Sequence, residues 1–285
     1  MVYCQIGSRL TSHFSSFEIK PMNRSIGFLL FLVFIAACSK EAPKIVKPDP
    51  FTPDKNCRIQ RLAASGTDQF SYEFYYEGDR LTGLLMTSPS FNWPIHHAFR
   101  YTGDNLTTIV QTLDNGFPDY DSLIVRFTYD SQGRPVSYEK NRYINNQPYG
   151  SPGQEYEYQT DRITGTLTQS GFASSDIFIL DEVGNVRRHE VRSPDGDLIR
   201  FEESEFDNWA SPFRSFPLAV KLYFNVQLAA AWNNNVTKMQ CTSFADGETL
   251  SGQIDYAYNS EGFPTQSTAD SGHLLSYQMA YDNCD

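Results

Sequence analysis

Apolar and polar residues alternate along most of this chain in short runs, and each run ends in a tight turn. A run starts with two aromatic residues that are separated by one residue. It then passes through a turn that contains glycine and returns on an aliphatic residue. Alternation with period two places one face of a strand in a core, and glycine accepts the positive φ of a tight turn. The pattern therefore predicts β-hairpins. Copies lie at residues 72–81, 99–106, 127–136, 156–163, 178–186 and 256–262, with a truncated strand at 281–282.

The hairpins recur at a regular spacing. The equivalent tyrosines Tyr76, Tyr101, Tyr129 and Tyr158 are 25, 28 and 29 residues apart. One hairpin cannot bury its apolar face alone, so neighbouring hairpins must pair edge to edge. We predict a mainly β fold, an antiparallel meander of repeated hairpins that forms a curved open sheet or a partly closed barrel, as a single domain over residues 56–285.

Residues 213–231 interrupt the repeat. Leu218, Leu222 and Val226 share one face of a helix, but residues 218–226 also fit the alternation of a strand. We predict a short helix that caps the sheet.

A different pattern precedes the repeats. Residues 26–37 form an unbroken apolar run of 12 residues that ends at Cys38. A membrane-spanning helix needs about 20 apolar residues, whereas the core of a secretory signal needs about 7–15. The length therefore favours a signal peptide, and Arg24 supplies its positive flank. Because the first 21 residues are polar and weakly charged, Met22 is the better start.

The end of this run resembles a bacterial lipoprotein signal. Ile35-Ala36-Ala37-Cys38 is similar to the lipobox. The resemblance implies cleavage after residues 1–37 and a diacylglycerol on Cys38, which anchors the chain to a membrane. Ser39 after the cysteine implies sorting to the outer membrane. Lys40-Glu41 matches only part of the acidic surface-export signal of Bacteroidota lipoproteins, so the cell surface and the periplasmic face both stay open.

A proline-rich tether follows the cysteine. Residues 38–55 contain four prolines, Pro43, Pro48, Pro50 and Pro53. Such segments stay extended at about 3.1 Å per residue. We expect this tether to hold the folded domain away from the bilayer.

The net charge limits the partners of the folded domain. The chain carries −11, and removal of the leader with Arg9, Lys20, Arg24 and Glu18 makes the charge −13. An acidic surface argues against nucleic acid as a partner. Aromatic residues make up 14% of the chain, which fits the filling of a thin β core.

Three cysteines besides Cys38 remain after cleavage: Cys57, Cys241 and Cys284. Disulfides are allowed in the oxidising envelope, and an odd number leaves at least one cysteine free or intermolecular. Cys57 opens the folded part and Cys284 nearly closes it, so this pair is the candidate that would join the two ends of the sheet. The connectivity itself stays open, and no metal site or cofactor is predicted.

The titratable residues form no catalytic pattern. His96 and His97 are adjacent and would point to opposite faces of a strand, while His189 and His273 stand alone. Glu202, Glu203 and Glu205 could serve glycoside hydrolysis, but a solvated strand explains them better.

Other motifs favour simple structural roles. Residues 114–121 are rich in oxygen ligands but lack the spacing of an EF-hand, which favours a plain loop. Trp93, Trp209 and Trp232 could stack on sugars, and core packing is preferred for each. The sequence has no G-x-S-x-G, H-E-x-x-H or phosphate loop, so no enzyme is predicted.

The fullest repeat resembles a known family. Tyr129-Asp-Ser-Gln-Gly-Arg134 is similar to the YD motif of Rhs/YD-repeat proteins, and divergent copies behind a lipobox resemble Bacteroidota envelope lipoproteins with such repeats. Residues 206–213 and 232–238 are similar to an insertion found between hairpins in that family. The resemblance spans residues 57–285 and implies no catalytic residues.

Together these features predict a lipid-anchored outer-membrane or cell-surface protein that acts as a non-catalytic binding or scaffolding module. Its partners would be the membrane, through Cys38, and a glycan or an envelope protein. The alternatives are a periplasmic carrier of a hydrophobic ligand and a carbohydrate-active enzyme.

Overall fold

The computed structural model describes residues 57–282 apart from 66–69, 90–93, 118–119, 146, 169–173, 225–231, 245–246 and 272–275. The described strands are β1 (Arg58–Ser65), β2 (Ser71–Glu77), β3 (Arg80–Thr87), β4 (Ile95–Thr102), β5 (Asn105–Phe117), β6 (Tyr120–Tyr129), β7 (Pro135–Ile144), β8 (Gln147–Tyr158), β9 (Arg162–Thr168), β10 (Ser175–Leu180), β11 (Val186–Arg192), β12 (Leu198–Ala210), β13 (Asn234–Ser243), β14 (Thr249–Tyr258), β15 (Pro264–Ala269) and β16 (Ser276–Asp282). The described helix is α1 (Leu218–Tyr223).

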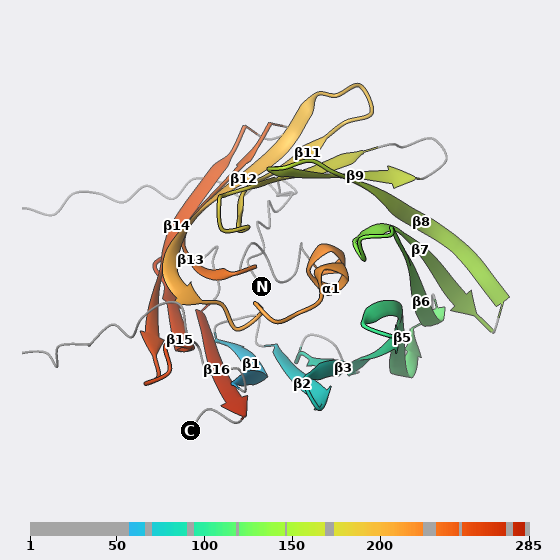
Figure 1. The fold of residues 1–285 in the computed structure, drawn as a ribbon, viewed down its shortest axis with the longest axis horizontal. Helices are drawn as coiled ribbons and strands as arrows, with labels where there is room; N and C mark the ends of the chain where they lie inside the picture. Colours follow the sequence, from blue (N-terminus) through green and yellow to red (C-terminus); the bar gives the residue numbers. More distant parts are fainter. Residues whose placement is uncertain are drawn as a thin grey trace, which may run out of the picture. The chain divides into compact units, whose positions relative to one another are not determined.

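These strands form a closed antiparallel barrel (Figure 1). Each strand pairs with its neighbours in the chain, and β1 pairs with β16 from Arg58↔Asp282 to Ser65↔Ser276, which joins the ends of the meander. The predicted meander of hairpins is therefore confirmed, and the sheet closes completely.

The barrel has two different ends. One end, which we term the turn end, carries the short connections such as β2–β3, β4–β5, β6–β7 and β14–β15. Because the strands are antiparallel, the start of β1 and the end of β16 also lie at the turn end. At the opposite, far end lie the connections β1–β2, β3–β4, β5–β6, β7–β8, β9–β10, β11–β12, β13–β14 and β15–β16.

The repeated Asp/Asn–x–x–Gly motif forms the same turn each time. The carboxylate of Asp130 accepts hydrogen bonds from the backbone N–H groups of Gln132 and Arg134, both at 2.9 Å, and Gly133 adopts φ 74°. A polar side chain that binds its own backbone two and four residues on fixes such a turn. Asp181 and Asn259 bind their turns in the same way.

In five copies the repeated tyrosine joins its strand to the strand before it. Its hydroxyl reaches across the barrel wall and donates to a backbone carbonyl of that preceding strand. This bond explains why the tyrosine recurs with the turn. The bonds run from Tyr76 to Ile59 (3.1 Å), Tyr101 to Leu81 (2.7 Å), Tyr129 to Leu106 (2.6 Å), Tyr158 to Pro135 (2.6 Å) and Tyr281 to Pro264 (2.7 Å). In the copy at residues 256–262 the equivalent tyrosine, Tyr258, instead donates to the carboxylate of Asp207.

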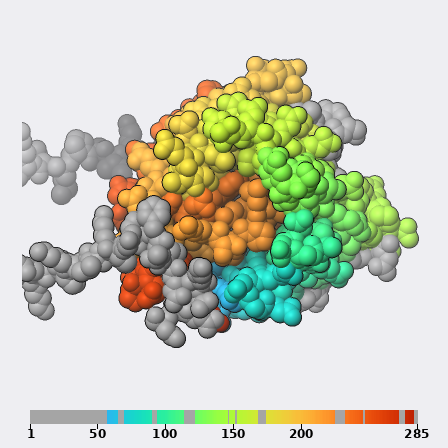
Figure 2. Space-filling model, in the orientation of Figure 1, coloured from blue at the N-terminus to red at the C-terminus, as the bar shows by residue number. Residues whose placement is uncertain are grey.

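Between β12 and β13 the chain enters the barrel instead of making a short turn. We term residues 211–224 and 232–233 the plug. It contains α1, which confirms the predicted short helix, and lies within the ring of strands (Figure 1). The space-filling view shows it occupying the space between the walls (Figure 2). Its aromatic rings contact the inner wall in the pairs Phe213–Phe74, Phe216–Phe74, Phe224–Phe99, Tyr223–Phe127 and Trp232–Phe178.

A buried asparagine holds the base of the plug. The side-chain oxygen of Asn185 accepts hydrogen bonds from the backbone N–H groups of Asn233 (3.0 Å) and Asn234 (2.9 Å). Its amide nitrogen donates to Asp181 at 2.9 Å and to the Asn234 side chain at 3.0 Å. All its polar atoms are thus paired, as a buried amide requires.

The inner and outer surfaces of the wall differ in polarity. Inward positions supply the apolar core, in which Tyr72, Ile109 and Val125 are among the fully buried side chains. Outward positions around the barrel carry exposed charges, including Arg100, Arg126, Glu139, Glu155, Glu157, Glu205, Lys238 and Asp255.

Across the part of the chain that is described, none of the helices has the length and apolar character needed to cross a bilayer.

Candidate functional site

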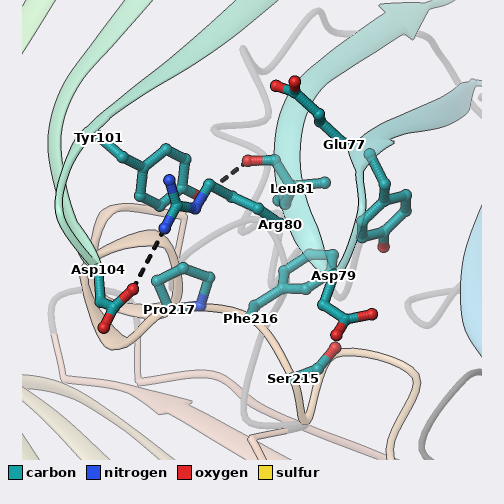
Figure 3. A pocket seen from close by; sticks show the side chains of 10 residues that line it. Glu77, Asp79, Arg80, Leu81, Tyr101, Asp104, Ser215, Phe216 and Pro217 are labelled. Carbon is teal, nitrogen blue, oxygen red and sulfur yellow. Dashed lines mark hydrogen bonds and ion pairs between the residues drawn. The ribbon is translucent and has the colours of Figure 1, made fainter.

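In the described part of the barrel, a pocket at the turn end and a polar cluster on the inner wall are candidate ligand sites. The pocket, which we term the rim pocket, has a volume of about 410 Å³ and lies between two hairpin turns and the plug (Figure 3). Its lining residues are Tyr76, Glu77, Asp79, Arg80, Leu81, Tyr101, Asp104, Ser215, Phe216 and Pro217.

Most polar groups of the rim pocket bind one another. The guanidinium of Arg80 lies 4.7 Å from the centre of the Tyr101 ring and donates to Asp104 at 3.2 Å (Figure 3). The Tyr101 hydroxyl donates to Leu81, and burial raises the pKa of this tyrosine to about 12 although Arg80 opposes the shift. Asp79 pairs with Arg58. Two carboxylates of the rim pocket, Asp79 and Asp104, are therefore already paired with arginines.

The second place is the lumen cluster, which consists of Gln154, Asp176, His189 and Glu202 on β8, β10, β11 and β12. The Nε2 of His189 lies 3.0 Å from Asp176, and its Nδ1 lies 3.9 Å from Glu202. The amide of Gln154 donates to the other oxygen of Asp176 at 2.8 Å. Four strands, β8 and the three consecutive strands β10, β11 and β12, thus contribute to one connected network.

His189 is held in its charged form by this network. Burial disfavours the charge, but the hydrogen bond to Asp176 and the nearby carboxylate of Glu202 outweigh burial and raise the pKa of His189 to about 9. The ring also stacks on Phe178 with a centroid distance of 4.8 Å and an interplanar angle of 10°. At neutral pH the lumen cluster therefore contains an imidazolium between two carboxylates.

Lys140 lies beside the lumen cluster and faces the plug. Its Nζ is 5.1 Å from the ring centre of Tyr138 and 5.3 Å from that of Tyr223 on the plug. Burial lowers the pKa of Lys140, Arg142 lowers it further, and Asp176 partly offsets both. In the described part of the chain, the ammonium makes no ion pair with a carboxylate.

Two of the histidines, His97 and His189, point into the barrel and contact other side chains there. His97 points inward against Phe224, with a ring distance of 5.2 Å, and burial lowers its pKa to about 4. His96 is less buried, in agreement with adjacent residues on opposite faces. His189 does not stand alone, because it joins the lumen cluster. His273 lies outside the described residues.

The acidic run on β12 divides between the two faces of the wall. Glu203 and Glu205 are exposed on the outside, as a solvated strand predicts. Glu202 instead faces inward to His189. Period-two alternation could have separated Glu202 from Glu203, but its approach to His189 depends on the pairing register.

The two described tryptophans, Trp209 and Trp232, pack against other aromatic rings of the protein. Trp232 is buried in the plug and contacts Phe178 at 6.1 Å. Trp209 stacks on Tyr258 at 5.2 Å. Trp93 and the side chains of residues 114–121 lie outside the described residues.

Cys57 and Cys241 are both disulfide-bonded. Cys38 and Cys284 lie outside the described residues, so the lipid on Cys38 and the pairing of Cys57 with Cys284 stay predictions. The register Arg58↔Asp282 brings the two ends of the sheet together next to Cys57, which fits that pairing. Within the described ranges no three His, Cys, Asp or Glu residues are placed to hold a metal ion.

Comparisons with known proteins identify the fold. No protein-family model matches the chain, and no curated protein matches it. A porin-like protein from Bacteroides vulgatus ATCC 8482 has a similar structure, with a TM-score of 0.50 and 10% identity over 80% of this chain and 100% of its own. A porin-like protein from Bacteroides uniformis ATCC 8492 matches with a TM-score of 0.36 and 14% identity over 79% and 96% of the two chains. At 10% identity the first likeness shows a shared barrel fold and no more.

Proposed function

We propose that this chain is a lipid-anchored protein of the bacterial outer membrane, whose barrel stands in water and acts as a non-catalytic binding module. The observation that carries the proposal is the polarity of the wall. A barrel embedded in lipid presents an apolar band outward, and Arg or Lys at the middle of that band costs about 2–4 kcal/mol. Here Glu139, Lys238 and Asp255 are exposed on the outer wall.

The presence of the plug favours a binding module rather than an open pore. Porins enclose a water-filled channel, and the structural neighbours are described as porin-like. In this chain, aromatic side chains of the plug pack against the inner wall on β2, β4, β6, β7 and β10. Solute flow through the lumen would have to displace these contacts.

Anchoring through Cys38 would also orient the barrel. The tether predicted at residues 38–55 precedes β1, and β1 starts at the turn end. An acyl chain on Cys38 would therefore hold the turn end, with the plug, nearer the membrane. The connections of the far end would face away and meet a glycan or an envelope protein.

A second candidate function is carriage of a hydrophobic ligand. The aromatic inner wall favours it, because rings such as Tyr138 and Tyr156 border the polar lumen cluster. In this case the lumen, and not the far end, would be the binding surface.

Lipid labelling and fractionation test the proposal. Cells that express the full chain or Cys38→Ala are grown with an alkyne analogue of palmitate, and membranes are separated from soluble extract without detergent. We expect the full chain to be labelled and membrane-bound, and Cys38→Ala to be unlabelled and soluble, while a Ser39→Ala control stays bound. Retention of folded Cys38→Ala in the membrane until detergent is added would refute a barrel that stands in water.

A further inference from the structure

We propose that the lumen binds an anionic amphiphile whose charged group lies against Lys140. This inference rests on the second candidate function above, carriage of a hydrophobic ligand in the lumen, and names the class of ligand. It depends on a half-buried ammonium that lies among aromatic rings and makes no ion pair with a described carboxylate.

The position of Lys140 is fixed by the wall and the plug together. The residue lies on β7, and its Nζ is 5.1 Å from the ring of Tyr138 on the same strand and 5.3 Å from the ring of Tyr223 on α1. Ring faces attract a cation, but they do not supply the hydrogen bonds that an ammonium loses with water. Lys140 is half-buried, and a lysine that loses contact with water is normally paired.

The carboxylates near Lys140 are committed to other partners. Asp176 is the carboxylate whose charge acts most directly on Lys140. One of its oxygens accepts from Gln154 at 2.8 Å, and the other lies 3.0 Å from Nε2 of His189.

Glu202, the second inward carboxylate of this region, is also engaged. It lies 3.9 Å from Nδ1 of His189 and 3.5 Å from the guanidinium of Arg200. The described part of the wall therefore leaves the Lys140 charge without a counter-ion. A ligand carboxylate, sulfonate or phosphate would provide one through a charge-assisted hydrogen bond.

The surroundings of Lys140 define the rest of the ligand. Tyr138 contacts Phe127 at 5.8 Å, Tyr156 at 6.1 Å and Tyr223 at 5.8 Å, which makes a continuous aromatic wall beside the ammonium. Such a wall favours an apolar or planar body. An anionic head with an apolar body matches both parts of the site, whereas a neutral sugar would leave the ammonium unpaired.

Two dyes with the same ring system test this assignment. 1-Anilinonaphthalene-8-sulfonate carries a sulfonate, and N-phenyl-1-naphthylamine lacks it. We expect the full chain to bind the sulfonate dye more tightly. Lys140→Gln should weaken the binding of the sulfonate dye by about tenfold, because one charge-assisted contact is lost. The affinity for the neutral dye should stay unchanged. Lys140→Arg should retain the affinity for the sulfonate dye. Lys238→Gln, on the outer wall, should bind both dyes like the wild type.

The outcomes separate this inference from the proposed function. Equal weakening of both dyes in a folded Lys140→Gln variant overturns the role of the charge but keeps the lumen as a binding site. Failure of the wild type to bind either dye overturns the inference and lumen binding together, and leaves the labelling of Cys38 as an independent result. If Lys140→Gln does not fold, competition on the unaltered chain decides: displacement of the sulfonate dye by hexadecanoate but not by hexadecanol supports the inference, and equal displacement refutes it.

Discussion

Alkaline pH should destabilise the barrel through His189. The imidazolium is favoured in the folded chain, where its pKa is raised from 6.5 to about 9. The folded state therefore binds a proton more tightly than the unfolded state. The resulting stability is fully present below pH 6.5, falls as the pH rises, and is absent above about pH 9. The difference in pKa corresponds to about 3 kcal/mol.

Urea unfolding of the wild type and of His189→Gln from pH 6 to pH 9.5 measures this effect. Subtraction of the two curves removes the opposite contribution of Lys221, whose pKa burial lowers to about 8 and which therefore adds stability as the pH rises above that value. We expect the advantage of the wild type to shrink by about 3 kcal/mol across this range. A difference that does not change with pH would show that Asp176 and Glu202 do not hold the charge.

Three further perturbations test other parts of the structure. Tyr129→Phe should cost about 1 kcal/mol in urea unfolding, because it removes the 2.6 Å bond to Leu106 and keeps the ring; an unchanged midpoint would contradict a joining role for the hydroxyl. Asn185→Ala should cost about 3 kcal/mol and expose the plug to trypsin at Arg214, because it removes the bonds that hold the plug base; the exposed Asn208→Ala should do neither. Acid should destabilise the wild type relative to His97→Phe as the pH falls from 6.5 to 4, because the folded chain keeps His97 neutral with a pKa of about 4; parallel acid curves would contradict this.

The local β structure could be predicted because its determinants are close in sequence. Asp130 binds the backbone of its own turn, and Gly133 supplies the positive φ within four residues. The closure of the barrel depends instead on Arg58 and Asp282, which are at opposite ends of the domain. No periodic pattern specifies a contact of that sequence separation.

The plug and the lumen cluster depend on longer-range packing. Leu218 and Leu222 fit a helix or a strand, and only the ring of aromatic side chains around them decides that α1 lies within the barrel. His189 meets Glu202 because of the register of β11 and β12, which shifts at a bulge beside Val191. One such shift exchanges the faces of a strand, so sequence alternation alone could not assemble this cluster.

The central claim is that the outer wall of the barrel is in contact with water while the chain is anchored. Single cysteines in place of Glu139, Glu155, Lys238 and Asp255 would be treated with a charged, membrane-impermeant maleimide in isolated outer membranes opened by sonication, with inward Val125→Cys as the control. We predict rapid labelling of all four outward positions without detergent and none at Val125. Protection of the four outward positions until detergent is added would place the wall in lipid and contradict the account.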